Sequence, residues 1–282
     1  IKLDDSFSGE GNAVFRYPEV SPGARLDRDA VAEGLRRLEY VLPSDDEGSY
    51  FEKFARMGGI VEEFIAGRDK QSPSVQMRST PSGGAMTLST HDQILGGGTG
   101  QVFLGCSFPA RDDYRRAINR EAEKIGAVLA RYGVVSRFAI DFLTWRETPG
   151  GEWKVAALEI NLRMGGTTHP FLALQFLTGG RLDPDSGLFL SLSGQPKYYR
   201  ATDNLCSEAY RGLLPEDLID ILTLHKLHYS HGTESGVLFH LIGALSEFGK
   251  LGMTAIANSR EDVDRLYRRA LAVLDQEAAY GR

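Results

Sequence analysis

Cysteine, long apolar runs and excess positive charge are all scarce in this chain of 282 residues. The two cysteines, Cys106 and Cys206, form no CxxC pair, which favours two buried thiols in a reducing cytoplasm over a disulfide or a zinc site. No stretch approaches the roughly 18 apolar residues of a membrane span, and the start of the chain has no apolar core of a secretion signal. We therefore expect a cytoplasmic protein with no membrane partner.

The overall composition is that of an ordinary globular protein. Hydrophobic residues make up 42% of the chain and charged residues 25%, which excludes a disordered or collagen-like chain. The net charge of −6 argues against a nucleic-acid partner. The length suits one large α/β unit or two lobes. Glycine is the residue in excess: there are 32, about 11% against a usual 7% or so, and many of them cluster.

Hydrophobic periodicity predicts an α+β or mixed α/β fold with antiparallel sheet. Strands outnumber helices, and a turn at Pro149-Gly150-Gly151 joins two strands into a hairpin. Ser49-x-x-Glu52 predicts the start of a short helix that Gly58-Gly59 ends. The expected strands are 1–3, 13–17, 60–65, 75–79, 86–90, 101–108, 134–145, 153–162, 236–245 and 251–257. The other expected helices are 26–41, 113–132 with Tyr114, Ile118, Ile125, Val128, Leu129 and Tyr132 on one face, 170–177, 215–228 and 259–278.

A polar, glycine-containing turn near the start of the chain is the first candidate site. Lys2 is followed by Ser8-Gly9-Glu10-Gly11-Asn12, and two glycines allow backbone N–H groups to converge on an anion such as phosphate. Neither a Walker A motif nor a Rossmann fingerprint is present. A plain hairpin turn is the competing interpretation.

Two carboxylates and an amide on neighbouring strands form the second candidate site. Asp141 is the single charged residue of the apolar segment 138–143, and Glu159 and Asn161 share one face of the next strand. If the two strands pair, these oxygens meet and suit Mg²⁺; without a cation the carboxylates would repel each other. The alternative is that both point to solvent. We favour the cluster, because the apolar neighbours Ile140, Phe142, Leu158 and Ile160 should occupy the core face.

The loop that follows these strands is the third candidate. Arg163 can bind a phosphate or carboxylate by a bidentate contact, and Gly165, Gly166, Thr167 and Thr168 lead into a predicted helix. A glycine-rich connection without function is the alternative. The segment Val61–Asp69, considered alone, indicates an edge strand with a charged face. His240, between two apolar residues, is interpreted as a core histidine with satisfied hydrogen bonds, and His169 as a helix cap that could touch substrate.

These pieces, in this order, resemble the ATP-grasp superfamily of carboxylate–amine ligases. The resemblance implies that Lys2, also a catalytic residue, binds the phosphates with the loop over them, and that a hinge strand contacts adenine. It implies that Asp69 binds the ribose, that Asp141, Glu159 and Asn161 hold Mg²⁺ (or Mn²⁺), and that Arg163 is catalytic. The residues it assigns to ATP are Lys2, Ser8, Gly9, Gly11, Asn12, Glu62, Glu63, Phe64, Ile65 and Asp69. The residues it assigns to substrate are Gly165, Gly166, Thr167, Thr168 and, through the stretch 89–93, Gln93.

The branch that includes the peptide ligases of pheganomycin biosynthesis is similar over nearly the whole chain, including the motif 239–256. The implied fold holds ATP between two α+β lobes. The implied parts are residues 1–59, the remainder of the first lobe; 60–180, the second lobe; and 181–282, a family-specific C-terminal region. The family's upstream portion has no counterpart here, so we expect either that a preceding segment is missing or that this chain does not complete the nucleotide site alone.

The implied activity is ATP-dependent joining of a small carboxylate and an amine or peptide through an acyl phosphate, by an enzyme that could be a homodimer. Two alternatives remain: another ATP-grasp phosphoryl-transfer enzyme such as a carboxylase, and a non-catalytic or regulatory ATP-binding module.

Overall fold

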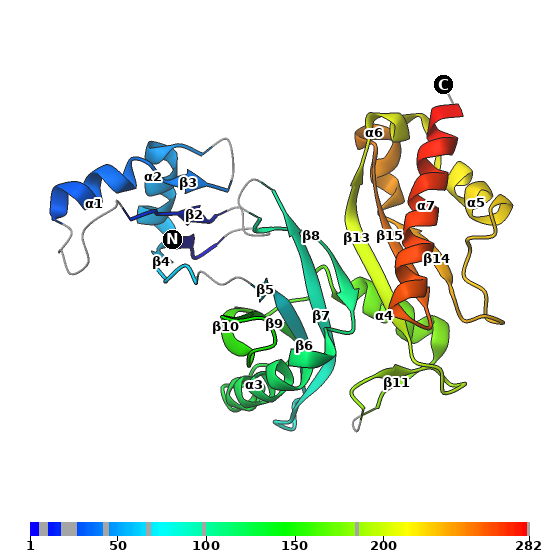
Figure 1. Ribbon diagram of the computed structural model, residues 1–282, viewed down its shortest axis with the longest axis horizontal. Coiled ribbons are helices and arrows are strands. Elements are labelled where there is room, and N and C mark those ends of the chain that lie inside the picture. Colours follow the sequence, from blue (N-terminus) through cyan, green and yellow to red (C-terminus); the bar gives the residue numbers. More distant parts are fainter. Residues whose placement is uncertain are drawn as a thin grey trace. The chain divides into compact units, whose positions relative to one another are not determined.

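The computed structural model describes residues 1–5, 11–17, 27–41, 45–65, 69–97, 100–183 and 186–280. The chain forms two compact units: unit 1 contains residues 1–66 and 95–103, and unit 2 contains residues 67–94 and 104–282 (Figure 1). Ser8 and Gly9, which the sequence assigns to ATP, lie outside the described residues. None of the described helices is both long and apolar enough to cross a membrane.

Among its described residues, the first 66 positions of unit 1 form two short strand pairs and two helices. Its hydrophobic core contains Leu3, Ala13, Leu38 and Tyr50, and the Tyr50 hydroxyl donates a 3.0 Å hydrogen bond to the carbonyl of Gly11. The strand pairs are β1 (Lys2–Leu3) with β4 (Gly59–Ile60) and β2 (Ala13–Val14) with β3 (Glu39–Tyr40). The helices are α1 (Arg28–Leu35) and α2 (Glu47–Met57).

Several expected boundaries in unit 1 are wrong. The helix expected to reach residue 41 ends at Leu35, because residues 39–40 pair with β2. The strand expected over 60–65 ends at Ile60: Val61 and Phe64 are 74% and 60% exposed, so burial on a sheet face does not hold them in a strand. Helix α2 begins earlier than expected, since Asp46 is its N-cap and Ser49 its third residue.

Unit 2 is organised around a nine-stranded sheet in the order β10-β9-β6-β7-β8-β13-β15-β14, with β5 also paired to β9. The following pairings are antiparallel, as predicted: β9 with β10 and β6, β6 with β7, β13 with β8 and β15, and β14 with β15. The strands are β5 (Asp69–Gln71), β6 (Pro73–Ser79), β7 (Ala85–Gly96), β8 (Val102–Phe108), β9 (Ser136–Arg146), β10 (Lys154–Asn161), β13 (Tyr198–Cys206), β14 (Gly236–His240) and β15 (Lys250–Ala257). A separate pair is β11 (Arg181–Leu182) with β12 (Phe189–Leu190).

Two long helices cover different parts of this sheet (Figure 1). Helix α3 (Asp112–Arg131) packs on β6, β9 and β10, and α7 (Arg260–Tyr280) packs on β13, β14 and β15. Of the face predicted for α3, Tyr114 and Ile118 are fully buried. Val128 and Tyr132 are exposed, which corrects that prediction; the helix ends at residue 131, before Tyr132. The remaining helices are α4 (Thr168–Thr178), α5 (Pro215–Leu224) and α6 (Leu245–Phe248), with short 3₁₀ turns at Glu208–Gly212 and Ile242–Ala244.

The two cysteines differ in environment. Cys106 is buried on β8, and burial raises the pKa of its thiol. Cys206 is exposed at the end of β13, so the prediction of two buried thiols is wrong for Cys206.

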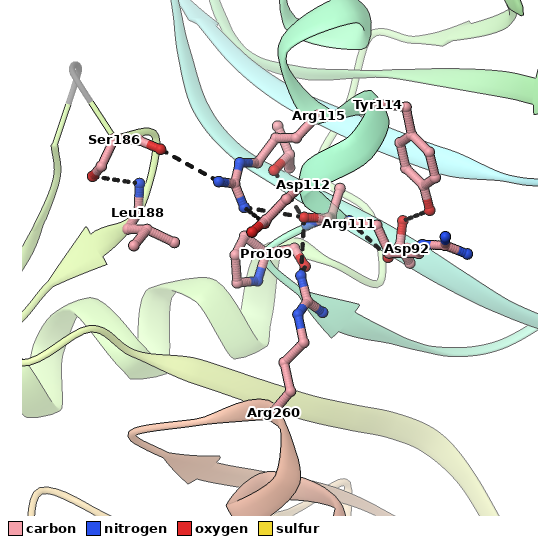
Figure 2. Close-up of polar contacts among 11 residues, drawn as sticks. Asp92, Pro109, Arg111, Asp112, Tyr114, Arg115, Ser186, Leu188 and Arg260 are labelled. Atoms are coloured by element: carbon pink, nitrogen blue, oxygen red, sulfur yellow. Dashed lines mark hydrogen bonds and ion pairs between the residues drawn. The ribbon is translucent and has the colours of Figure 1, made fainter. Parts of the chain in front are cut away.

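Two arginines join the start of α3 to distant parts of unit 2. Arg260, the first residue of α7, donates hydrogen bonds of 2.7 and 3.0 Å to the buried carbonyls of Pro109 and Ala110. Arg115 donates to the same Ala110 carbonyl and to the carbonyl of Ser186. Figure 2 shows the two guanidinium groups converging on this stretch of backbone. Helix α7 is thereby fixed to the chain that leads from β8 into α3.

We predict that Arg260→Leu lowers the free energy of unfolding by about 1–3 kcal/mol, because it leaves the Pro109 carbonyl without its charged donor and removes one of the two donors to the Ala110 carbonyl. Arg268→Leu, on the exposed face of the same helix, is the matched control and should change stability by less than about 0.5 kcal/mol. Urea unfolding measures both. Equal losses in the two variants would contradict the proposed link.

Candidate functional site

The register of β9 with β10 brings the predicted acidic pair together. Glu159 lies directly opposite Asp141, after a β-bulge between Ala157 and Glu159. The side-chain amide of Asn161 donates a 3.1 Å hydrogen bond to Asp141 Oδ2, and Gln93 Nε2 donates one of 2.8 Å to Asp141 Oδ1. The structure therefore groups three residues predicted to hold metal with one predicted to bind substrate.

The environment of Asp141 makes its ionised form costly. Burial is the main cause that raises the pKa of Asp141 to about 6, and the negative charge of Glu159 raises it further. Hydrogen bonds from Ser74 and Gln93 and the positive charge of Arg163 oppose this change. Two carboxylates and an amide oxygen are hard ligands suited to Mg²⁺, and a bound cation would remove the repulsion between Asp141 and Glu159. The residues present therefore fit a divalent metal ion.

The apolar neighbours of this pair are only partly as predicted. Ile140 and Phe142 are fully buried, as expected for the core face of β9. Ile160, which was expected to be in the core, is 44% exposed because β10 is the outermost strand of the sheet. Leu158 is half-buried and lies at the bulge.

The loop between β10 and α4 is anchored to the sheet by a residue that the sequence analysis did not identify. Gln76 Nε2, buried on β6, donates hydrogen bonds of 2.5 and 3.2 Å to the hydroxyls of Thr167 and Thr168. The Thr168 hydroxyl also accepts a 3.1 Å bond from the N–H of Gly165. Gln76 alternates with the apolar residues Val75 and Met77, so strand periodicity places its side chain on the opposite, polar face of β6; this alternation was the available signal.

The two threonine hydroxyls and the Gly165 amide, predicted to face substrate, thus already have protein partners. Gly166 and Arg163 are exposed in the same loop.

Only one residue of the polar stretch 89–93 reaches the acidic pair. Gln93 contacts Asp141, whereas His91 is fully buried with its Nε2 2.6 Å from the Tyr199 hydroxyl. Burial lowers the pKa of His91 to about 3. Asp92 accepts a hydrogen bond from the hydroxyl of Tyr114, which fixes the start of α3 (Figure 2).

In unit 1, Lys2 forms an ion pair with Glu62. The sequence analysis predicts that these two residues bind different parts of ATP. The carbonyl of Gly11 accepts a 3.0 Å bond from the Leu3 N–H, and Asn12 donates a 2.7 Å bond to Gln101. Glu63, Phe64 and Ile65 follow β4 outside any strand, so the predicted hinge is not a strand at these residues.

Asp69, predicted to bind ribose, lies on β5 in unit 2 and is paired with Arg146 of β9. Arg146 Nε lies 2.6 Å and Nη2 2.5 Å from Asp69 Oδ2. Arg146 also lies over the ring of Trp153, with 4.7 Å between its Cζ and the ring centroid.

Residues 45–185 match a protein family described as "IQCH-like, ATP-grasp". The chain belongs to this ATP-grasp family. Residues 217–270 match a second family, described as "PGM1 C-terminal domain". The α+β ATP-grasp fold predicted from the sequence is therefore confirmed. The division at residues 59/60 and 180/181 stays a prediction.

This ATP-grasp chain is similar to two named relatives and to one solved structure. It is 34% identical over 233 residues to L-propargylglycine–L-glutamate ligase of Streptantibioticus cattleyicolor, covering 83% of the chain and 46% of the relative. It is 22% identical over 134 residues to IQ motif-containing protein H of Danio rerio, covering 48% and 13%. The chain thus spans less than half the length of these relatives.

N5-carboxyaminoimidazole ribonucleotide synthetase from Thermus thermophilus has a similar fold, with a TM-score of 0.50 and 15% identity over 88% of this chain and 65% of that one.

We predict that Asp141→Asn, measured without divalent cations, raises the free energy of unfolding at pH 7.5 by about 1–3 kcal/mol. The folded-state pKa of about 6 lies above the ordinary value, so ionised Asp141 destabilises the folded protein above that pH. The gain should disappear as the pH falls below about 4, where the carboxyl is protonated in both states.

Urea unfolding with a chelator at pH 7.5 and pH 4 measures this difference. Asp220→Asn, on the exposed surface of α5, is the control and should change stability little at either pH. A destabilised Asp141→Asn protein at pH 7.5 would contradict the electrostatic interpretation.

Proposed function

We propose that this protein is an ATP-dependent carboxylate–amine ligase that forms an amide bond through an acyl phosphate and releases ADP and phosphate. The observation that carries the proposal is the position of Asp141 opposite Glu159, with Asn161 hydrogen-bonded to the same carboxylate. The ATP-grasp family of the chain and its 34% identity to a named amino-acid ligase support it.

Asp141, Glu159 and Asn161 would hold Mg²⁺, or Mn²⁺ in its place. A bound divalent ion would neutralise charge on the phosphates of ATP. Arg163, whose positive charge already acts on Asp141, would steady the transferring phosphoryl group. Gln93 would keep Asp141 oriented while contributing to the substrate side of the site.

Residues of unit 1 are proposed to bind the nucleotide. Lys2, with Gly11, Asn12 and the neighbouring residues 8–9, would bind the phosphates, and residues 62–65 would contact adenine. Lys2 is paired with Glu62, and its ammonium has three N–H donors, so it would bind a phosphate oxygen beside this carboxylate or in exchange for it. For unit 2, Asp69 is proposed to bind the ribose while it is paired with Arg146.

The proposed reaction has two steps. A substrate carboxylate oxygen attacks the γ-phosphorus, the bond to the bridging oxygen breaks, and ADP leaves. The amine nitrogen then attacks the carbonyl carbon of the acyl phosphate, phosphate leaves, and the nitrogen loses a proton. Arg163 and the loop 165–168 act by positioning and by stabilising negative charge, which supplies most of the catalysis in phosphoryl transfer.

The proposed substrates are amino acids or short peptides. The relative from Streptantibioticus cattleyicolor is named for L-propargylglycine and L-glutamate, and we transfer only the class of substrate, an α-amino acid on each side of the new bond. The cytoplasmic location and the homodimer also stay proposals.

We expect the full-length protein, supplied with ATP, Mg²⁺ and pairs of amino acids that each include L-glutamate, to form a dipeptide and an equal amount of ADP. Mass spectrometry detects the product as the sum of both amino acids minus water. ADP release that requires bicarbonate and no amine would instead indicate a carboxylase. Calorimetric binding of a non-hydrolysable ATP analogue without turnover would indicate a binding module.

We further predict that Glu159→Gln combined with Asn161→Ala abolishes amine-dependent ADP release, because a single carboxylate then remains to hold the metal. A coupled ADP assay measures the rate. Glu152→Gln, an exposed residue just before β10, is the matched control and should retain the wild-type rate. Unchanged ADP release in the double variant would falsify the metal assignment.

A further inference from the structure

Two histidines from distant parts of unit 2 lie against each other. His169 belongs to the first turn of α4, and His240 is the last residue of β14. Their ring centroids are 4.5 Å apart. His240 belongs to the motif 239–256, to which the proposed function assigns no role.

The sheet has a space shaped for the imidazole of His240. Gly252 on β15 is the direct partner of His240 in the strand register. A Cβ atom at Gly252 would lie 2.1 Å from His240 Nε2, so only glycine leaves room for the ring. Gly252 does not have a positive φ, so the imidazole and not the backbone conformation requires this glycine.

His240 also carries an unused hydrogen-bonding atom. Its Nδ1 is buried, and no partner for it occurs within the described part of the chain. The prediction of a core histidine with satisfied hydrogen bonds is therefore wrong. The hydroxyl of Thr254, on the same face of β15 as Gly252 and fully buried, is likewise without a partner among the described residues. Buried polar atoms are costly unless bonded, so a further hydrogen-bond partner for the His240 imidazole would be favourable.

The pair lies beside the proposed acyl-transfer loop. His169 directly follows Thr168, whose hydroxyl accepts from Gln76 and from the N–H of Gly165. That loop is in turn the continuation of β10, which carries Glu159 and Asn161. After His240 the chain leaves the strand at once, since Leu241 has a φ of 54°. The His240 ring therefore lies at a strand end, next to a histidine that is exposed to solvent.

Burial, and then the charge of His169, lower the pKa of His240 to about 4. At neutral pH its ring is therefore uncharged and keeps one nitrogen lone pair available as an acceptor. An incoming amine requires such an acceptor, because it must present its own lone pair to the acyl carbon and release a proton.

We propose that His240 is an amine-positioning residue, whose imidazole accepts a hydrogen bond from the attacking amine, with His169 passing the released proton to solvent. This rests on the proposed ligase function. When the C–N bond forms and the C–O bond to phosphate breaks, the proton leaves the nitrogen through the histidine pair. The motif 239–256 thereby acquires a role: it supplies the imidazole and the glycine that accommodates it.

The test separates the two half-reactions with the amino-acid pair selected by the dipeptide assay. Hydroxylamine traps an acyl phosphate as a hydroxamate and, as a small free nucleophile at neutral pH, does not need to be positioned. We expect His240→Phe to form hydroxamate within about twofold of the wild-type rate, while dipeptide formation falls by about 100-fold. His240→Asn, which keeps a polar atom near the position of Nδ1, should recover part of the dipeptide rate.

Gly252→Ala, which displaces the ring, should change the hydroxamate and dipeptide rates in the same way as His240→Phe. Thermal unfolding checks that each variant is folded. His231→Ala, an exposed histidine, should leave both rates unchanged. Equal losses of hydroxamate and dipeptide in folded His240→Phe, or no loss of either, would overturn the role of His240. A wild-type protein that forms no hydroxamate would overturn the ligase proposal and this inference together.

Discussion

The pairing of Asp141 with Glu159 across two antiparallel strands is the interaction on which the candidate site depends. Like charges directly opposite each other destabilise a sheet, and burial of Asp141 adds to this cost, as its raised pKa shows. The strands keep this register because the rest of the sheet fixes it: β9 is held by β6 and β5 on its other side. A bound cation would attract both carboxylates, so the arrangement that is costly without a cation would be favourable with one.

The continuous sheet also connects regions that are far apart in the sequence. Gln76 of β6 fixes the start of α4 through two threonine hydroxyls, and the same turn of α4 brings His169 to His240 on β14. The part of the chain similar to the PGM1 C-terminal domain, residues 217–270, thus supplies a side chain next to the proposed catalytic loop. This is a reason for such a region to accompany an ATP-grasp core.

The parts of the fold that the sequence predicted well have strong periodicity and clear turn residues. Helix α3 and the β9–β10 hairpin lie within two residues of their expected boundaries. Strand β7 extends to Gly96, well beyond the expected residue 90, because its polar residues His91 and Asp92 find partners elsewhere in the fold. Strand β13 was not predicted, since polar residues interrupt its apolar pattern, yet it is an inner strand of the sheet, between β8 and β15.

The sequence by itself determined which residues carry the chemistry of the acidic site, because alternation along a strand places Glu159 and Asn161 on one face and leaves Asp141 as the exception in an apolar segment. Only the tertiary structure decided what surrounds them. Gln93 reaches Asp141 and His240 meets His169 through contacts between residues 48 and 71 positions apart in the chain. Such contacts follow from strand order and register, and no local pattern encodes these.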